Sequence, residues 1–412
     1  MKFKFLKNLF EGKKRLPKTD ITRRFELIGR VGQGSMSRVW RARDTFSGKI
    51  VALKVLDKEK TRRFEARFAP ELQKPTEGEV AVSLRHPNIV TTYEYGMTLE
   101  GEQFLVMEFV DGLGLSYLVD VQNDVMKKHR LAFMIQLGDA IRYFHEQNWI
   151  HRDICPRNVM VTDLDLQVKL IDFGLVVPNT APFQAPGNRT GTANYMAPEL
   201  IKRQRTDQRI DVFSFAVTCF EMFTRRYPWA AAESLEMVLQ HINTPPLDIR
   251  EAVPGIDEQV AAAIMKGLNT NPKDRWPAID PMLYQFREAQ ERLFPTKSEK
   301  ARRAAQAKAE ARAKVAKAVA PTPGITLAEE GITLAEDQPD LKPLATPKSA
   351  ATPGITLANE GIALADDQPD LKPVTPKKAT APTPGITLAD DESGSLAPRK
   401  TPETVSDGDG KV

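Results

Sequence analysis

The chain has 412 residues, 41% of them hydrophobic, and a formal net charge of +4 at pH 7. This length allows two or three average domains, or one larger domain with additional segments. The 30 prolines are concentrated after Ala320, so only the earlier part of the chain can build a sizeable core. The two cysteines, Cys155 and Cys219, have no zinc-binding spacing, and the sequence indicates neither a zinc site nor a disulfide framework.

Charge is segregated along the chain. Residues 1–24 carry +7, residues 297–320 carry +6 and residues 321–412 carry −7, which leaves −2 for residues 25–296. The basic character belongs to two flanks, so we expect no nucleic-acid partner. No apolar run reaches the roughly 18 residues that span a bilayer, and the lysine-interrupted start lacks a signal-peptide core. We therefore expect a cytoplasmic protein without a transmembrane segment.

Residues 1–24 form a basic leader in which Phe3, Leu6 and Phe10 share one helical face. This pattern fits weak contact with an anionic membrane surface. It also fits a disordered leader, which is the simpler interpretation because so short a segment binds weakly without a second anchor. Lys2 excludes N-myristoylation.

Residues 25–108 contain the short runs typical of β-strands. The runs are FELIGRV, SRVWRAR, KIVALKVL, IVTTYEYG and EQFLVMEF, and one helix candidate that ends near His86 interrupts them. From about Leu115 the pattern becomes helical, with an amphipathic helix over residues 126–147 and an apolar helix over residues 210–223. A small β-rich unit followed by a larger helical one is expected, with a ligand cleft between them.

A glycine-rich turn joins the first two predicted strands. Glycine permits backbone conformations and close approaches that a β-carbon forbids, so the amide groups of such a turn can lie over a triphosphate. Many glycine-rich turns bind nothing, and this motif alone is a weak signal. Its residues are Val31, Gly32, Gln33, Gly34, Ser35, Met36, Ser37, Arg38 and Val39.

Lys54 lies in the strongly apolar run VALK. A lysine in such a strand is costly unless it is paired, and the expected anionic partners are a nucleotide phosphate and a carboxylate. The carboxylate should come from the helix before His86. We prefer Glu77 to Glu79 as that partner.

A second polar group follows in HRDICPRN and DFG. Asp153 and Asn158 come from the first motif, and Asp172 closes the apolar strand KLID. Hard oxygen atoms in this pattern suit a site that orients a hydroxyl group and chelates Mg²⁺. The segment GTANYMAPE, which ends at Glu199, comes next.

The ordered set of glycine-rich loop, VALK, HRD with its asparagine, DFG and APE resembles the eukaryotic-type (Hanks-type) serine/threonine protein kinase family over residues 25–294. The resemblance implies an α+β, bilobal fold: a small β-rich N-lobe with helix C (25–108) and a larger helical C-lobe (111–294). It also implies transfer of the γ-phosphate of ATP to serine or threonine hydroxyls of a protein substrate.

The resemblance further implies a role for each matching residue. Asp153 would orient the acceptor hydroxyl and accept its proton. Lys54 would hold the α- and β-phosphates of ATP and pair with Glu77. Asn158 and Asp172 would bind Mg²⁺.

Other matches concern the adenine pocket and the support of loops. Met107 resembles the residue at the back of that pocket. The backbone from Glu108 to Val110 resembles the hinge that forms hydrogen bonds with adenine. Glu199 would pair with Arg275, and Asp211 would anchor the catalytic loop from below. These last roles are structural.

Regulation is implied by Arg152, which directly precedes Asp153. In this family such an arginine marks kinases whose activation loop is ordered by a phosphate group. Thr190 is the first candidate for the phosphorylated residue and Thr180 the second, whereas Thr192 fits the substrate-docking segment. Thr190 could also be an ordinary loop threonine.

Cys155 is the main departure from the family pattern. Serine/threonine kinases usually have a lysine here, which would contact the transferred phosphate. Its loss predicts reduced turnover rather than inactivity, and a higher rate for Cys155→Lys. Arg157 is the nearest candidate for a compensating cation. The Cys155 thiol is expected to be a packed residue rather than a reactive one.

The rest of the chain does not resemble a kinase. Residues 295–320 are an Ala/Lys/Arg-rich linker or helix, and residues 321–412 are a Pro-rich tail with a repeat of roughly 30 residues. Each repeat has few large aliphatic residues and no aromatic ones, so a disordered tail is favoured over a solenoid. The repeats either recruit a tail-binding protein or are duplications without a partner.

Two other functions are alternatives to an active kinase. A catalytically weak kinase-fold scaffold with a partner-recruiting tail is disfavoured because the residues of the ATP and Mg²⁺ sites are all present. A small-molecule phosphotransferase is disfavoured by the APE segment, Thr192 and Arg275, which fit a docking surface for a polypeptide.

Overall fold

The computed structural model describes one body, residues 16–295 with short gaps, and a few helical residues that follow it. The described residues are 16, 18–33, 37–68, 70–187, 190–230, 242–295, 302, 305–306 and 308–310. In the last group, Gln306 Nε2 donates to Glu310 Oε1 at 3.3 Å. The predicted disordered tail, its repeats and the first fifteen residues lie outside the described residues.

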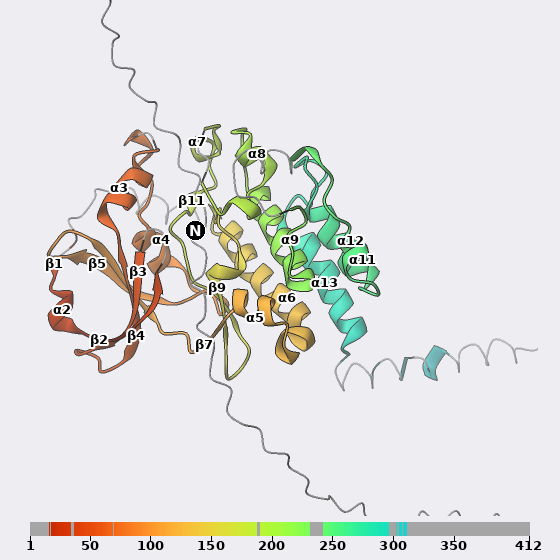
Figure 1. Cartoon of the computed structure of the whole chain (residues 1–412), viewed down its shortest axis with the longest axis horizontal. Helices are drawn as coiled ribbons and strands as arrows, with labels where there is room; N and C mark the ends of the chain where they lie inside the picture. The colour runs from red at the N-terminus through yellow and green to blue at the C-terminus, as the bar shows by residue number, and fades with distance from the viewer. Residues whose placement is uncertain are drawn as a thin grey trace, which may run out of the picture. The chain divides into compact units, whose positions relative to one another are not determined.

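The amino-terminal lobe is built on a six-stranded sheet, drawn in red to orange in Figure 1. Its strand order is β1-β5-β6-β4-β3-β2, and every neighbouring pair is antiparallel except β1 with β5. The five predicted β-like runs all contain strands of this sheet. The strands are β1 (Lys18–Thr19), β2 (Phe25–Gln33), β3 (Ser37–Asp44), β4 (Ile50–Leu56), β5 (Thr92–Thr98) and β6 (Gln103–Glu108).

The pleat of the sheet decides where Lys54 points. On β4, Val51, Leu53 and Val55 belong to one buried cluster, with Phe25 and Phe104 from neighbouring strands. Because side chains alternate along a strand, Lys54 lies on the opposite face. This face is the one that the lobe's helices and the second lobe cover.

Three short helical segments lie between β4 and β5: α3 (Lys58–Glu65), the 3₁₀ turn η1 (Pro70–Leu72) and α4 (Glu77–Ser83). A capping box formed by Thr76 and Glu79 starts α4. Gly78 lets α4 pack closely on β5, because a Cβ there would lie 2.5 Å from the ring of Tyr95. These contacts place Glu77 at the first turn of α4, beside the sheet.

Residues 18–24 differ from the prediction of a basic leader that ends at residue 24. They form β1 and the short helix α2 (Ile21–Arg24), which Asp20 caps. Arg24 pairs with Asp44 at 3.2 Å and also with Glu94. The charge pattern of the sequence did not indicate this structure, because it shows Arg24 as one more charge of a basic leader. In the fold, Arg24 is the partner of two carboxylates on the sheet.

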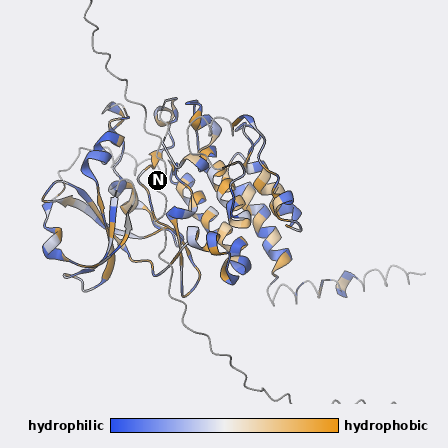
Figure 2. Ribbon diagram, in the orientation of Figure 1, coloured by the Kyte–Doolittle hydropathy of each residue, from blue (hydrophilic) through white to orange (hydrophobic). Residues whose placement is uncertain are grey.

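The carboxy-terminal lobe is mainly helical, and its core lies between α6, α9, α12 and α13 (Figures 1 and 2). Small residues allow close helix packing: a Cβ on Gly138 would lie 2.2 Å from Leu283. The predicted apolar helix is buried along most of its length as α9. The helices are α5 (Leu115–Val121), α6 (Asp124–Glu146), α7 (Ala181–Gln184), α8 (Pro198–Ile201), α9 (Arg209–Thr224), α11 (Ile249–Ala252), α12 (Glu258–Gly267) and α13 (Ile279–Leu293).

Short strands and 3₁₀ turns at the junction of the lobes carry the polar motifs. The α+β class with a β-rich and a helical lobe is confirmed. Among the described residues, no helix has both the length and the apolar content that a membrane crossing requires. The short elements are β7 (Gly112–Gly114), β8 (Trp149–Ile150), η2 (Pro156–Asn158), β9 (Val159–Thr162), β10 (Val168–Leu170), β11 (Val177–Pro178) and η3 (Ala193–Tyr195).

Candidate active site

Lys54 joins the two lobes through two carboxylates. Its Nζ lies 2.5 Å from Glu77 Oε1 on α4 and 2.9 Å from Asp172 Oδ1, which follows β10. Glu77 thus reaches Lys54, whereas Glu79 is used in the helix cap. Gly174 is also close, since a Cβ there would lie 3.4 Å from both Asp172 Oδ1 and Glu77 Oε2.

The electrostatics of this group keep the ammonium charged. Burial alone would lower the pKa of Lys54, but the charges of Asp172 and Glu77 outweigh it and raise that pKa above its ordinary value. Burial raises the pKa of Glu77, and Lys54 opposes this shift. The pKa of Asp172 is lowered despite burial, mainly by Lys54. The three groups therefore hold a buried positive charge at the junction of the lobes.

Asp153 is held from three directions. Its Oδ1 accepts hydrogen bonds from Thr192 N at 3.0 Å and from Thr192 Oγ1 at 2.8 Å. Its Oδ2 accepts one from Asn158 Nδ2 at 2.8 Å. The carboxylate is half-buried and therefore both fixed in direction and accessible.

The loop that carries Asp153 rests on a buried aspartate from α9. Asp211 accepts the backbone N–H groups of His151 and Arg152, each at 2.8 Å, and lies 3.0 Å from His145 Nε2. Arg152 adopts a left-handed backbone conformation, with φ 69°, which these bonds stabilise. The His151 ring packs edge-on against Phe144 and Phe173, which is a structural role.

Asn158 and Asp172 are neighbours through the backbone, because Ile171 N donates to Asn158 O at 3.0 Å. Asn158 Nδ2 binds Asp153, so the amide oxygen is the atom that could bind a metal. One carboxylate and one amide oxygen fit Mg²⁺, which usually takes its other ligands from phosphate and water. No group of three His, Cys, Asp or Glu side chains in the described ranges forms an all-protein metal site.

The glycine-rich turn is described only in part. Gly34, Ser35 and Met36 lie outside the described residues, Val31 is exposed, and Gly32 and Gln33 pair with Val39 and Arg38 in the β2–β3 ladder. Val39 pairs with Lys54 in register and so shares its face of the sheet, and Ser37 shares it too because it lies two residues away. Arg38 lies on the opposite face, where Nη2 bonds Glu102 at 2.9 Å. Any contact of Arg38 with a nucleotide would therefore come from its backbone.

The segment from Glu108 to Val110 leads from β6 into the second lobe. The Glu108 side chain accepts from Thr91 N at 2.8 Å and from Lys169 Nζ at 2.9 Å. Met107, directly before this segment, is buried. The hinge is thus tied to both lobes by the Glu108 side chain, and its backbone after Glu108 continues outside the ladder.

Cys155 and Arg157 lie beside Asp153 on the same loop. Burial raises the pKa of the Cys155 thiol to about 12, so the thiol is neutral and packed, as expected. Arg157 is exposed, and its Nη2 lies 3.2 Å from Thr192 Oγ1.

A second buried cation, Arg152, contacts the segment between Asp172 and Glu199. Arg152 Nη2 donates to Phe183 O at 2.9 Å, but its Nε and Nη1 have no partner among the described residues. The buried hydroxyl of Thr190 also has no hydrogen-bond partner among the described residues. Gly191, the residue after Thr190, lies close to the Arg152 backbone, because a Cβ there would lie 2.9 Å from Arg152 O.

Lys74 is a further cation near Arg152, and the sequence did not predict its position. Burial lowers the pKa of Lys74 to about 8, Glu65 opposes this and Arg152 adds to it. Its Nζ lies 5.1 Å from the Phe64 ring centre. Lys74 is half-buried and is the one lysine between Lys60 and Lys127, and no local pattern in the sequence marks it as part of a site.

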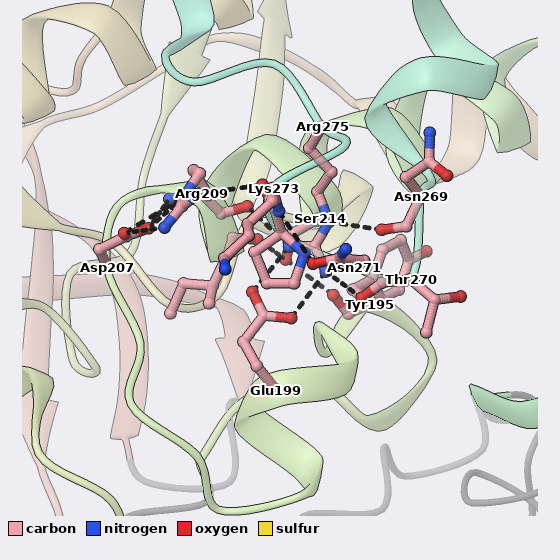
Figure 3. Close-up of polar contacts among 12 residues, drawn as sticks. Tyr195, Glu199, Asp207, Arg209, Ser214, Asn269, Thr270, Asn271, Lys273 and Arg275 are labelled. Carbon is pink, nitrogen blue, oxygen red and sulfur yellow. Dashed lines mark hydrogen bonds and ion pairs between the residues drawn. The ribbon is translucent and has the colours of Figure 1, made fainter.

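Glu199 and Arg275 form the predicted pair, which is almost fully buried (Figure 3). Arg275 Nη1 and Nη2 donate to the two carboxylate oxygens at 2.7 and 2.6 Å. The other donors of Arg275 bond backbone carbonyls of Arg209, Asn269 and Thr270. This bidentate pair fixes the segment after Thr192 to the loop between α12 and α13, which Arg275 also bonds to α9.

Comparison with known proteins gives consistent matches. The family described as Protein kinase domain matches residues 25–286. A probable serine/threonine-protein kinase of Streptomyces coelicolor is 32% identical over 267 residues, 63% of this chain and 39% of that protein. Serine/threonine-protein kinase PknB of Mycobacterium leprae is 30% identical over 63% of this chain and 42% of its own length.

A third relative is serine/threonine-protein kinase PrkC of Bacillus subtilis, 27% identical over 64% of this chain and 40% of that protein. The chain thus spans about two-fifths of the length of the curated relatives that it matches.

Proposed function

This chain belongs to the protein kinase domain family, and from that premise we propose that it transfers the γ-phosphate of ATP to serine or threonine hydroxyls of proteins. The observation that carries the proposal is the joint presence of the Lys54–Glu77–Asp172 group and the Asp153–Asn158–Thr192 group at one junction. One group supplies a buried positive charge for a triphosphate, and the other fixes a carboxylate for a hydroxyl.

The reaction needs little covalent work from the protein. The acceptor oxygen attacks the γ-phosphorus, and the bond from that phosphorus to the β,γ-bridging oxygen breaks. ADP leaves with the electron pair of that bond. The hydroxyl proton passes to the Asp153 carboxylate and then to solvent. Asp153 is suited to this task because Thr192 and Asn158 hold both of its oxygens in place.

We assign the nucleotide site to residues of both lobes. Lys54 would bind the α- and β-phosphates and, with Asp172, keep them in line. The amide oxygen of Asn158 and the Asp172 carboxylate would hold Mg²⁺, which neutralises phosphate charge when bound. The turn from Val31 to Val39 would cover the phosphates, and the backbone of Glu108 to Val110 would bond the adenine.

We also propose that phosphorylation of Thr190 orders the activation segment. A phosphate there would give acceptors to the unpartnered Nε and Nη1 of Arg152. Lys74 would be the second cation, because the charge of Arg152 contributes to lowering the pKa of Lys74 and the two side chains therefore lie near each other. Thr180, the other candidate, instead precedes α7, where its backbone oxygen accepts from Phe183 N and Gln184 N.

The test is an ATP-Mg phosphorylation assay on the full chain with phosphoamino-acid analysis, run beside Asp153→Asn. We expect phosphoserine or phosphothreonine from the wild type and a loss of about 100-fold or more in the variant. Equal signal from both would overturn the proposal. Phosphopeptide mapping tests the regulation separately, since absence of phosphate between Asp172 and Tyr195 would contradict it.

A further inference from the structure

Arg41 on β3 reaches from the sheet of the first lobe to the segment that joins the lobes. Its guanidinium carbon lies 4.9 Å from the centre of the Phe109 ring. A cation within roughly 6 Å of a ring centre is attracted by the face of the ring. Phe109 directly follows β6 and packs half-buried against the large core cluster. Arg41 therefore connects the sheet with the backbone between the lobes.

The pleat of the sheet explains this reach. Arg41 pairs in register with Ala52, which lies two residues before Lys54 on β4, so these three side chains share one face. On the other side of β3, Arg41 pairs with Gly29, where a Cβ would contact nothing within 4 Å. Ala52 in turn pairs with Met107, two residues before the ring. Two small neighbours thus leave room for the long arginine side chain to cross this face towards the hinge.

The residue before Phe109 is held from the opposite direction. The Glu108 carboxylate accepts a hydrogen bond from Lys169 Nζ at 2.9 Å, and Lys169 belongs to β10 beyond the hinge. The Lys169 side chain is 12% exposed, so this ion pair is shielded from water. Two consecutive hinge residues are therefore held by cations from two different sheets, Glu108 by Lys169 and Phe109 by Arg41.

We propose that Arg41 is a positioning residue for the nucleotide, because its contact with Phe109 holds the backbone from Glu108 to Val110 in the position that bonds adenine. This proposal rests on the proposed nucleotide site. The contact exists in the hinge position that the structure shows, so its loss lowers the fraction of molecules that are ready to bind. Arg41 acts through Phe109, and its effect is therefore on nucleotide affinity rather than on the chemical step.

The experiment measures binding of ADP-Mg to the full chain by calorimetry, together with the KM for ATP and kcat. Arg41→Met keeps the length of the side chain and removes its charge. We expect the Kd for ADP-Mg and the KM for ATP to rise about two- to fivefold, with kcat within about 1.5-fold of the wild type. Arg41→Lys keeps a cation for the ring, so all three values should stay within about 1.5-fold.

Two further changes separate this contact from a general effect of charge. Phe109→Leu keeps an apolar side chain but removes the ring face, and it should weaken ADP-Mg binding as Arg41→Met does. Combining the two should weaken binding no further, because both remove the same interaction. Arg43→Met is the matched control, since Arg43 lies two residues along the same face of β3 and pairs with Glu26 at 3.6 Å. It should leave ADP-Mg binding within about 1.5-fold of the wild type.

The proposal is overturned if Arg41→Met binds ADP-Mg within about 1.5-fold of the wild type, or if Arg43→Met weakens binding equally. It is also overturned if the double variant shows the product of the two single effects. Thermal melting checks folding, and if Phe109→Leu melts early, the arginine variants decide: equal loss of affinity in Arg41→Met and Arg41→Lys contradicts the proposal.

Failure of this inference is distinguishable from failure of the proposed function. A wild type that binds ADP-Mg and phosphorylates protein, beside an unaffected Arg41→Met, leaves the kinase activity intact and removes the role of Arg41 alone. Absence of ADP-Mg binding to the wild type overturns the nucleotide site and, with it, the role of Arg41.

Discussion

Lys54 and Arg152 are both buried cations, each 4% exposed, but they differ in their partners. Lys54 bonds two carboxylates, and its pKa is raised. Arg152 bonds one backbone carbonyl, two of its nitrogen atoms have no partner in the described part of the chain, and burial lowers its pKa to about 10. One site is complete by itself, and the other lacks an anion.

This difference distinguishes a cation that stabilises the fold from a cation that suits regulation. A charge that is fully paired belongs to the folded state at all times, and its removal leaves its partners buried and unpaired. A buried charge without enough partners costs free energy until an anion arrives. The same domain can thus hold one cation for permanent use and a second for use after phosphorylation.

Lys54→Met should have the largest effect. Phosphotransfer should fall at least about 100-fold, because the triphosphate loses its buried cation. The free energy of unfolding should fall by about 3–5 kcal/mol, because Glu77 and Asp172 lose their shared partner. Denaturant unfolding and the ATP-Mg assay measure the two effects.

The matched control is Lys54→Met with Glu77→Gln. Removal of the Glu77 charge should restore part of the stability without restoring activity. Unchanged stability in Lys54→Met would contradict the view that this pair is a permanent part of the fold.

Arg152→Met should give the opposite result for stability. In the unphosphorylated protein we expect no change or a gain of about 1 kcal/mol, because an incompletely bonded cation is removed. After incubation with ATP-Mg, the wild type should gain at least about 10-fold in rate and the variant should not. Urea unfolding before incubation and rates after it measure both.

Thr190→Val is the control, since it removes the phosphate acceptor and keeps the shape. It should also fail to activate, whereas Thr180→Val should activate normally. If Arg152→Met destabilises the protein as strongly as Lys54→Met does, the contrast between the two cations is wrong.

Glu221 extends the comparison to a half-buried carboxylate with too little positive charge around it. Burial raises its pKa to about 7, with Asp120 adding to the shift and Tyr195 and Arg157 opposing it. Because its pKa is raised, the folded state binds the proton more tightly than the unfolded state. This contribution to stability is complete below the ordinary pKa of 4.5 and is lost as the pH rises to about 7.

Glu221→Gln should therefore be more stable than the wild type above pH 7, by roughly 1–3 kcal/mol, with the difference vanishing near pH 4. Denaturant unfolding at several pH values measures this. A constant difference across the pH range would show that Glu221 does not titrate with the raised pKa.

The sequence predicted those parts of the site that depend on local patterns along the chain. The strand around Lys54 and the choice of Glu77 over Glu79 follow from local pattern and motif spacing. The pairing of Glu199 with Arg275 was predicted from the resemblance to the kinase family. Contacts that depend on folding were not found. Lys74 lies half-buried near the rings of Phe64 and Phe68, and Arg157 meets Thr192 from a loop 35 positions away.

The structure of residues 18–24 was not predicted for the same reason. Residues 18–24 read as part of a charged leader, yet Lys18 and Thr19 pair with the far edge of the sheet at Met97 and Thr98. Such a pairing depends on the exposed edge of β5, which no local pattern in the leader reveals.

Arg38→Ala is the smallest expected effect, and it tests the assignment of faces on the sheet. Arg38 pairs with Glu102 at the surface, with side chains 47% and 24% exposed, so its loss should cost no more than about 1 kcal/mol. Because Lys54 lies on the other face, the KM for ATP and kcat should both stay within about twofold of the wild type. Val39→Ala is the matched change on the Lys54 face and should raise the KM for ATP. An equal rise in Arg38→Ala would mean that the Arg38 side chain turns toward the nucleotide.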